Sequence, residues 1–319
     1  MATLEELSRR FSDFAETSAG SRAPLYRTIA SSVGGDHEVL DILRAAPETQ
    51  QLPVLLLAAV HHLLIGGGDP VLAAHYPNLT AEPVSGDVGA AFRSFALEHA
   101  EELRRLVAVR HTQTNEVGRC AQFLPALGML ADEVGDLARI DVGSSAGLTL
   151  LLPRFHYLYE PGGEVGSTSP VTLRCGTRGP VPVPRSMPNL TRSIGIDLQP
   201  VDVLDDTEAR WLEACVWPDH ADRFRLLVAA IAMAREHRPD VRRGDAVHDI
   251  AATVDEIGVH GHPVLTTSWV MNYLTPSGRL EFVAELDRIG ASRDLSWVIA
   301  EAPAVTRGLP VPTTDPPEH

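Results

Sequence analysis

The stretch from Ile140 to Leu150, which reads IDVGSSAGLTL, decides how this chain is expected to fold. An apolar run ends there in a turn of small residues, and a second apolar segment follows the turn. This order predicts a buried strand, a tight turn and a helix start, the layout in which parallel sheets bind nucleotide-type ligands at their carboxyl edge. Gly143 and Gly147 have no Cβ, so the backbone at both positions can pass close to a ligand.

The same turn departs from the G-x-G-x-x-G pattern that binds dinucleotides. Its two glycines are four residues apart, and Ser145 stands where a middle glycine would let a pyrophosphate approach. The turn therefore favours a cofactor without phosphates, of which S-adenosylmethionine is the usual one. Asp141 adds a carboxylate at the base of the turn, which suits the positive charge of a sulfonium. A nicotinamide-dependent oxidoreductase stays open as an alternative.

After residue 135, short apolar runs alternate with amphipathic helical segments, which predicts a parallel sheet with right-handed crossovers. Strands are expected at Leu137–Val142, Ser193–Asp197, the segment that ends with Arg242–Ala246, Pro263–Trp269 and Leu295–Ala300. A helix is expected over Leu148–Tyr157, and a segment rich in Gly, Pro, Ser and Thr at about 159–190 predicts a β-rich insertion.

Residues 2–110 show helical spacing of apolar side chains, with one long helix expected over Ala90–Val109. We therefore predict two domains. Residues 1–112 form an N-terminal helical lobe, and residues 113–319 form a cofactor-binding domain that carries the insertion.

The order of three motifs resembles that of class I S-adenosylmethionine-dependent methyltransferases. These motifs are Asp141-x-Gly143-x-x-x-Gly147, an acid that ends the second strand at Asp197, and Gly244-Asp245-Ala246. The resemblance implies a Rossmann-like, mostly parallel sheet. It also implies that the glycine turn lies under the methionine and ribose of the cofactor, that Asp197 binds the ribose hydroxyls, and that Asp245 meets the adenine amino group.

The chain also resembles an uncharacterised bacterial family, mainly actinobacterial, that carries the runs Gln113–Arg119 and Gly195–Pro200. In the first run, Arg119 is expected to pair with the cofactor carboxylate or with substrate, while Asn115 and Glu116 bind the amino group. The alternative is a helix start capped by Thr114, with a surface Glu116–Arg119 pair. The predicted cofactor contacts are Asn115, Glu116, Arg119, Asp141, Gly143, Ser144, Ser145, Gly147, Asp197, Leu198, Gly244, Asp245 and Ala246.

Tyr273 and Glu301 are the candidate catalytic residues, because they follow the fourth and fifth expected strands. Tyr273 is expected to orient substrate and Glu301 to act as a base; the alternative for Tyr273 is plain packing. The acid often found after the fourth strand is missing, and a Pro-rich segment stands where such sheets usually end in an antiparallel hairpin. A non-catalytic protein is therefore a second alternative. A third is a hydrolase, because Ser145 is centred between Gly143 and Gly147 as in G-x-S-x-G.

Composition narrows the partners. The chain has 27 basic and 42 acidic side chains and a net charge of -15, which argues against nucleic acid. No apolar run reaches the roughly 18 residues of a membrane span, and the three cysteines have no metal-ligand spacing. We expect a cytoplasmic protein that binds no metal and no membrane and transfers a methyl group to a small molecule. The sequence leaves its oligomeric state open.

Overall fold

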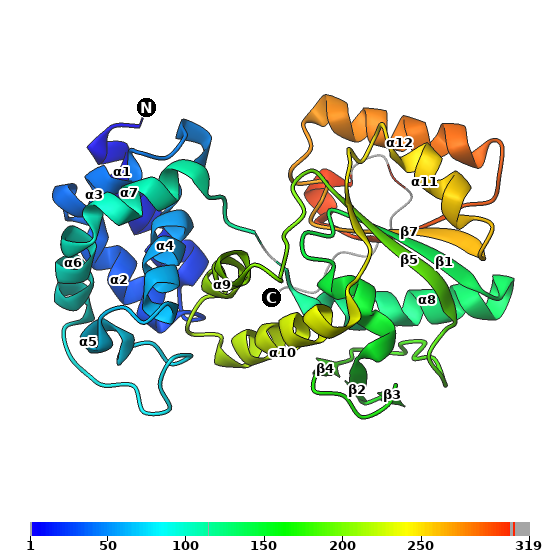
Figure 1. Cartoon of the computed structure of the whole chain (residues 1–319), viewed down its shortest axis with the longest axis horizontal. Helices are drawn as coiled ribbons and strands as arrows, with labels where there is room; N and C mark the ends of the chain where they lie inside the picture. The colour runs from blue at the N-terminus through cyan, green and yellow to red at the C-terminus, as the bar shows by residue number, and fades with distance from the viewer. Residues whose placement is uncertain (1, 114, 307–308, 310–319) are drawn as a thin grey trace. The chain divides into compact units, whose positions relative to one another are not determined.

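The structure, a computed structural model, describes residues 2–113, 115–306 and 309. The chain forms two compact units (Figure 1). The helical unit contains Met1–Glu116 and Asp202–Ala232, and the sheet unit contains Val117–Val201 and Met233–His319. The expected domain boundary after residue 112 did not include the return of residues 202–232 to the helical unit. Thr114 and most of the Pro-rich segment lie outside the described residues.

The helical unit is built from helices in two separate stretches of chain. In order they are α1 Leu4–Asp13, η1 Phe14–Ala19, α2 Pro24–Gly34, α3 His37–Leu43, η2 Glu48–Gln50, α4 Pro53–Ile65, α5 Pro70–Ala73, α6 Val88–Glu98, α7 Ala100–Val109, α9 Asp206–Ala214 and the first part of α10 Ala221–His237. The helix expected over Ala90–Val109 is in fact two, because the backbone at His99 leaves the helical region with φ -100° and ψ 18°.

The chemistry of the caps explains where several of these helices begin. The Thr3 hydroxyl accepts from the Glu6 N–H while the Glu6 carboxylate accepts from the Thr3 N–H, which is a capping box at the start of α1. The Asp205 carboxylate accepts from two N–H groups in the first turn of α9. Helix α4 is apolar on all sides and is almost entirely buried, as expected for a helix at the centre of a bundle.

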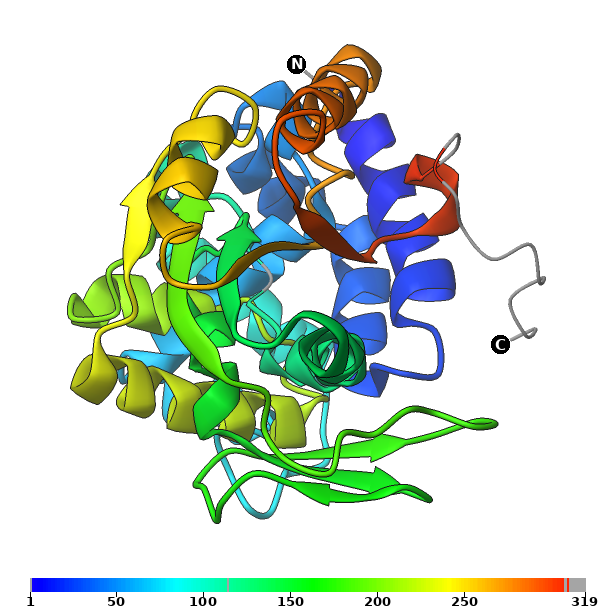
Figure 2. The same cartoon turned by 90° about the vertical axis from the view of Figure 1, so that its right-hand side faces the viewer.

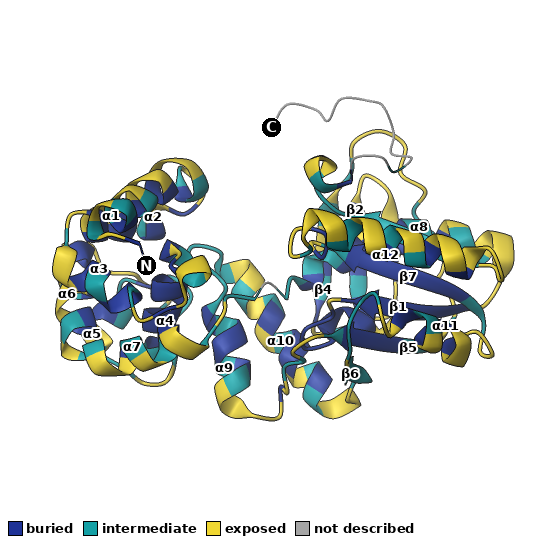
Figure 3. Ribbon diagram, turned by 90° about the horizontal axis from the view of Figure 1, so that it is seen from above, coloured by how far each residue is buried: buried dark blue, intermediate teal, exposed yellow. Residues whose placement is uncertain are grey.

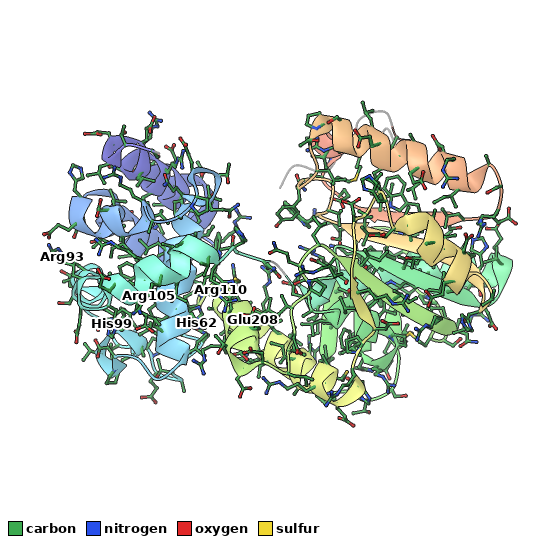
Figure 4. The ribbon with its side chains drawn as sticks, turned by 45° about the horizontal axis from the view of Figure 1, so that its top comes forward. His62, Arg93, His99, Arg105, Arg110 and Glu208 are labelled. Carbon is green, nitrogen blue, oxygen red and sulfur yellow. The ribbon has the colours of Figure 1, made fainter. Side chains whose placement is uncertain are left out.

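Helix α9 belongs to the core of the helical unit even though it follows α7 by about a hundred residues. The Trp211 side chain is 3% exposed, and its Nε1–H donates to the His111 carbonyl at 2.8 Å. Arg110, just after α7, forms an ion pair of 2.7 Å with Glu208 (Figure 4). Its guanidinium also lies over the Trp211 ring. These contacts complete the bundle with a helix that the chain supplies late.

The sheet unit contains the remaining elements. They are η3 Val117–Arg119, α8 Cys120–Val134, β1 Leu137–Val142, η4 Leu148–Arg154, β2 His156–Glu160, β3 Gly163–Val165, β4 Thr172–Gly176, β5 Leu190–Asp197, β6 Val241–Arg243, α11 Ile250–Ile257, β7 His262–Ser268, α12 Pro276–Gly290, β8 Ser296–Ala300 and η5 Pro303–Val305. Strand β1 has the bounds that the sequence predicted. The helix expected over Leu148–Tyr157 is instead a 3₁₀ helix, η4, followed by a strand.

Five strands form one sheet in the order β6-β5-β1-β7-β8, and every neighbouring pair is parallel. The chain starts at the central strand β1, moves outward to β5 and β6, then returns to the other side of β1 for β7 and β8. The loops that follow β1 and β7 therefore leave the same edge in opposite directions, which is the position where open parallel sheets bind ligands. The protein is thus of mixed α/β class with an all-parallel central sheet.

The two faces of β1 differ in chemistry. Ala138, Ile140 and Val142 join an apolar cluster with α11 and α12, while Arg139 and Asp141 alternate onto the opposite face. Figure 3 shows β1, β5 and β7 as mostly buried, with α12 exposed on its outer side. The central strands are therefore covered on both faces, as expected for a parallel sheet.

A second, smaller sheet has the order β3-β2-β4 and is drawn in Figure 2 as a layer apart from the parallel strands. It occupies the segment where a β-rich insertion was expected, although its first strand begins slightly earlier, at His156. The Tyr159 hydroxyl donates to the Ala121 carbonyl at 2.8 Å, which fastens this sheet to α8. Among the described residues, no helix has the length and apolarity needed to cross a membrane. The cytoplasmic location stays a prediction.

Candidate functional site

The turn after β1 is held to the end of β5 by its own backbone. The N–H groups of Gly143 and Ser144 both donate to the Ile196 carbonyl, at 2.8 and 3.3 Å, and the Gly147 N–H donates to the Ser144 carbonyl at 2.8 Å. Gly143 and Gly147 each have φ +69°, and Ser145 has φ +53°. The turn is therefore a fixed, left-handed excursion of the backbone.

Packing alone accounts for both glycines of the turn. A Cβ at Gly143 would lie 2.7 Å from Cγ2 of Val270, which follows β7. A Cβ at Gly147 would overlap the Val241 side chain of β6. The glycines are therefore needed wherever this turn is folded between its neighbours, and they do not by themselves indicate a ligand.

A buried ionic network lies directly beneath the turn. Arg139 is fully buried and donates from Nη2 to Asp141 Oδ1 at 2.8 Å and from Nε to the Thr266 hydroxyl at 3.0 Å. The Thr266 hydroxyl donates to Asp141 Oδ1 at 2.5 Å, and the Thr149 hydroxyl donates to Asp141 Oδ2. The expected role of Asp141 was to face a sulfonium. In the structure its side chain is 7% exposed, and the carboxylate is bonded to these partners.

The same network also compensates for a proline inside η4. An α-helix would pair the Thr149 carbonyl with the N–H of residue 153, and Pro153 has none. Arg139 Nη1 donates to that carbonyl at 2.7 Å instead. The arginine thus replaces a missing helical hydrogen bond as well as pairing with Asp141. This role of Arg139 is not predictable from the sequence, because Arg139 is one residue of the apolar run expected to form a strand.

Asp197 ends β5 and meets the turn after β1, 52 residues away in sequence. Its Oδ2 accepts from the Ser145 N–H and its Oδ1 from the Gln199 N–H, both at 2.8 Å. The next side chain, Leu198, is 64% exposed, which is high for a large apolar group at a sheet edge. The structure therefore brings the predicted acid, the predicted turn and an apolar surface together.

The third predicted motif adjoins this acid through the backbone. The Gly244 N–H donates to the Asp197 carbonyl at 2.9 Å, and the Ala246 side chain packs against the apolar cluster under α11. Asp245 Oδ1 accepts from the Val247 and His248 N–H groups and contacts His248 Nδ1 at 2.8 Å. Hydrogen bonding, first from the His248 N–H, holds the pKa of the Asp245 carboxyl below its usual value, so the group is a carboxylate at neutral pH.

A second cluster follows β7 and β8. Glu301 Oε1 accepts from the Val270 N–H at 2.9 Å, while Oε2 is buried and has no partner among the residues the structure describes. Burial raises the pKa of the Glu301 carboxyl. Arg119 donates from Nη1 to the Ser268 carbonyl at 3.1 Å. Tyr273 is 76% exposed. Because Val270 also touches the turn at Gly143, Glu301 is linked to that turn through one residue.

Asn115 and Glu116 fall in the helical unit. There they line a cavity of about 340 Å³ together with Arg223, which forms an ion pair with Glu116. Arg223 belongs to α10, so Glu116 joins the run at 113–119 to that helix. Sequence reasoning identified the polar run but not the cavity, because its other walls come from distant segments. No cluster of three potential metal ligands occurs in the described part of the chain.

These features place the chain among mixed α/β proteins with a five-stranded parallel sheet. Asp197, Asp245 and a glycine turn lie at the carboxyl edge of that sheet. The chain belongs to a family described as an uncharacterized protein conserved in bacteria (DUF2332), whose model matches residues 8–316. Neither the curated proteins nor the solved structures contain a match to the chain.

Proposed function

We propose that the sheet unit is a Rossmann-like domain of the class I methyltransferase type, which binds S-adenosylmethionine, and that the protein transfers a methyl group to a small molecule. The strand order supports this proposal, because the central strand β1 is followed by the outward strands β5 and β6 and then by β7 on its other side. The turns after β1, β5 and β6 lie at one edge, where the expected ligand contacts are.

One observation carries the proposal: the Asp197 carboxylate lies on the Ser145 N–H of the turn after β1. This bond fixes the carboxylate and leaves it partly exposed. A carboxylate oxygen has two lone pairs, so each oxygen of Asp197 can accept one further bond from a ribose hydroxyl. Leu198 presents its apolar side chain beside the same site, suited to the face of an adenine ring, and Asp245 offers an acceptor for the adenine amino group.

The turn is poorly suited to a dinucleotide. Pyrophosphate binding needs backbone N–H groups that point at the ligand and an α-helix whose first turn follows the loop. Here the N–H groups of Gly143, Ser144 and Ser145 already donate within the protein. The element that follows is the seven-residue 3₁₀ helix η4. These observations favour an adenosyl cofactor over a nicotinamide dinucleotide.

S-adenosylmethionine supplies an electrophilic methyl group to an acceptor oxygen or nitrogen. Glu301 is the residue suited to receive the proton that the acceptor loses, because burial raises the pKa of its carboxyl and one oxygen is free of partners among the described residues. Arg119, whose Nη1 donates to the Ser268 carbonyl, is the guanidinium that we expect to contact a ligand carboxylate. Trp269 and Tyr273, 53% and 76% exposed, can flank an acceptor.

Isothermal titration calorimetry with S-adenosylmethionine, S-adenosylhomocysteine and NAD tests the proposal. Both adenosyl ligands are expected to bind the full chain and NAD to give no heat. Asp197→Asn removes the charge and is expected to weaken adenosyl binding by about 1.5–3 kcal/mol. Asp294→Asn, at an exposed position of the same unit, is the matched control. Heat from NAD alone, or equal affinity in Asp197→Asn and Asp294→Asn, would refute the proposal.

A hydrolase is the second candidate, favoured by the backbone at Ser145. This serine has φ +53° between Gly143 and Gly147, as a nucleophile on a sharp strand-to-helix turn would. Asp245 and His248 form a carboxylate–imidazole contact after β6. Labelling with a fluorophosphonate probe, lost in Ser145→Ala, would support this candidate. Absence of labelling in the wild-type protein would exclude a reactive serine.

A further inference from the structure

The helical unit contains a cavity of about 340 Å³, within the size range of small-molecule sites. All of its lining residues belong to the helical unit, so it is a feature of that unit by itself. Its walls come from three separate stretches: the loop before α2, the run at 113–116, and the segment from α9 to α10. We call it the α9–α10 cavity. Its lining includes the polar side chains of Arg22, Asn115, Glu116, Trp217, His220 and Arg223.

The wall formed by Trp217 is held in place on several sides. Its ring packs against Phe14 with centroids 5.3 Å apart and against Tyr26 at 5.9 Å. Asp219 accepts from the Leu25 N–H at 2.8 Å and the Tyr26 N–H at 3.3 Å, which fixes the α9–α10 connection to the start of α2. The His220 ring stacks on the same indole, with centroids 5.9 Å apart, so the two rings form one fixed aromatic wall of the cavity.

The charged groups of the cavity sum to a positive lining. Arg22 and Arg223 contribute two guanidinium groups, and Glu116 balances one of them. Burial lowers the pKa of His220, so its imidazole is neutral at pH 7. A positive lining is notable in a chain whose net charge is -15, because the field of the whole chain repels anions. Local recognition of an anion requires such a cluster.

Asn115 provides an independent observation. Its Nδ2 is buried and has no hydrogen-bond partner among the residues described. Buried donors are almost always paired, and an unpaired one beside an open volume is explained by an acceptor that enters the volume, such as a water, an ion or a ligand. The amide is on the cavity wall, next to the Glu116–Arg223 pair. An acceptor atom on a bound ligand would satisfy it.

We propose that the α9–α10 cavity binds a small organic acid, with its carboxylate or phosphate engaged by Arg22 and Arg223 and its flat apolar part lying against Trp217. Asn115 donates to an acceptor atom of the same ligand. Guanidinium groups bind both kinds of anion through paired N–H donors, so the chemistry of the walls is the same for either. Cys215 takes no covalent part, because burial raises the pKa of its thiol to about 12.

Four probes test this proposal on the full chain: benzoate, phenyl phosphate, inorganic phosphate and benzylamine, each at millimolar concentration. Binding is followed by tryptophan fluorescence and by calorimetry. Benzoate or phenyl phosphate is expected to bind, and whichever is tighter identifies the anionic group. Inorganic phosphate is expected to bind more weakly and benzylamine not at all. The fluorescence change is expected to disappear in Trp217→Phe while the calorimetric affinity falls only a fewfold.

Arg22→Gln is the central variant, because Arg22 is exposed and its loss should leave the fold intact. It is expected to weaken the tighter aromatic anion by about tenfold or more, the size of a charge-assisted hydrogen bond. Arg27→Gln, an exposed arginine of α2 outside the cavity, is expected to leave affinity unchanged. Asn115→Leu is expected to weaken binding by about two- to tenfold.

Three outcomes would overturn the proposal. They are no binding of either aromatic anion, tighter binding of benzylamine than of benzoate, and equal affinities in Arg22→Gln and Arg27→Gln. Binding of inorganic phosphate as tight as that of phenyl phosphate would remove the role given to Trp217. Adenosyl ligands are expected to bind Arg22→Gln as they bind the wild-type protein, so failure here is distinguishable from failure of the proposed methyltransferase.

Discussion

The Arg139–Asp141 network beneath the turn after β1 and the α9–α10 cavity are both polar, but they use their polar atoms in opposite ways. Beneath the turn after β1, the Asp141 carboxylate receives three donors, and Arg139 donates to three acceptors. In the cavity, Asn115 Nδ2 is buried without a partner among the described residues. The buried network makes its hydrogen bonds within the protein, whereas the cavity wall keeps a donor that a ligand can satisfy.

This contrast separates two roles that polar residues play in a folded chain. A network with all its bonds made gives a rigid platform, and removing one member leaves the others unpaired at a high cost. An unpaired donor beside an open volume costs stability until a ligand supplies the missing acceptor.

The largest effect is expected from Arg139→Met, which leaves Asp141 buried without its counter-charge. The substitution is expected to destabilise the sheet unit by about 3–5 kcal/mol. Arg139→Met combined with Asp141→Asn is expected to cost less than Arg139→Met alone, because the unpaired charge is gone. The measurement is urea unfolding, with hydrogen exchange of the β1 and β7 amides.

Arg174→Met is the control for that pair, because Arg174 and Glu160 form an ion pair with side chains 72% and 73% exposed. A surface pair of this kind contributes about 0–1 kcal/mol. Equal losses in Arg174→Met and Arg139→Met would show that the buried network is no more than another ion pair.

In the helical unit, His61 is expected to make stability fall with acidity. Burial lowers the pKa of its imidazole from 6.5 to about 4, and its Nδ1 contacts the Ala214 carbonyl while Nε2 contacts Asn78 Nδ2. The native state therefore favours the neutral ring, while the unfolded chain takes up a proton below pH 6.5. Stability is expected to fall between pH 6.5 and 4, by about 3 kcal/mol in full.

His61→Gln is expected to lose this part of the pH dependence and to be less stable at pH 7 by about 1–3 kcal/mol. His37→Gln, at an exposed position, is the control. Unfolding by urea at pH 7, 5 and 4 gives the comparison. An unchanged acid slope in His61→Gln would mean that another group causes the loss.

Glu301→Gln is expected to change the stability of the protein less than His61→Gln does. At neutral pH it is expected to raise that stability. Burial raises the pKa of the Glu301 carboxyl above its ordinary 4.5. The protonated carboxyl therefore stabilises the folded protein below pH 4.5, and this contribution is lost as the pH rises through the pKa of the folded state. The glutamine has no charge to bury. The melting temperature of the Glu301→Gln protein is expected to exceed that of the wild type at pH 8 and to equal it near pH 4.

Glu164→Gln, at an exposed position of β3, should match the wild type at both pH values. If Glu301 is the base, Glu301→Gln should also lose methyl transfer while it keeps affinity for S-adenosylhomocysteine. Retained activity would assign Glu301 to structure alone.

The smallest effect concerns His220 at the α9–α10 cavity. Burial and Arg223 lower the pKa of its imidazole, Arg22 acts in the same direction, and Asp219 and Glu116 oppose them. A bound anion favours the protonated ring, so affinity for benzoate, which stays ionised over this range, is expected to rise severalfold as the pH falls from 7.5 to 5.5. His220→Gln is expected to remove that rise in affinity. A rise that persists in this variant would show that another group causes the pH dependence.

The sequence predicted the sheet better than it predicted the site. Strand β1 was placed from its apolar run, and Asp197 was placed at the end of a strand that does meet the turn. The break at His99 was missed, because apolar spacing continues across it. Strands and helices can be predicted from local patterns of apolar residues, because their formation depends on residues that are near one another in the chain.

Two features were beyond local pattern. The partners of Arg139 come from β7 and from η4, so a charged residue within an apolar run gave no sign of its role. The α9–α10 cavity draws on residues near 22, 115 and 220, and only the run at 113–119 stood out in sequence. Sites assembled from distant stretches cannot be read from any one of them.

The return of residues 202–232 to the helical unit also sets an order for biosynthesis. Trp211 occupies the core of that unit, yet it is made 100 residues after its partner His111. At 5–20 residues per second, a ribosome needs roughly 5–20 s to cover that distance. During this interval the nascent helices expose the apolar surface that α9 will cover. The amino-terminal helices therefore complete their core only after the second half of the chain has emerged.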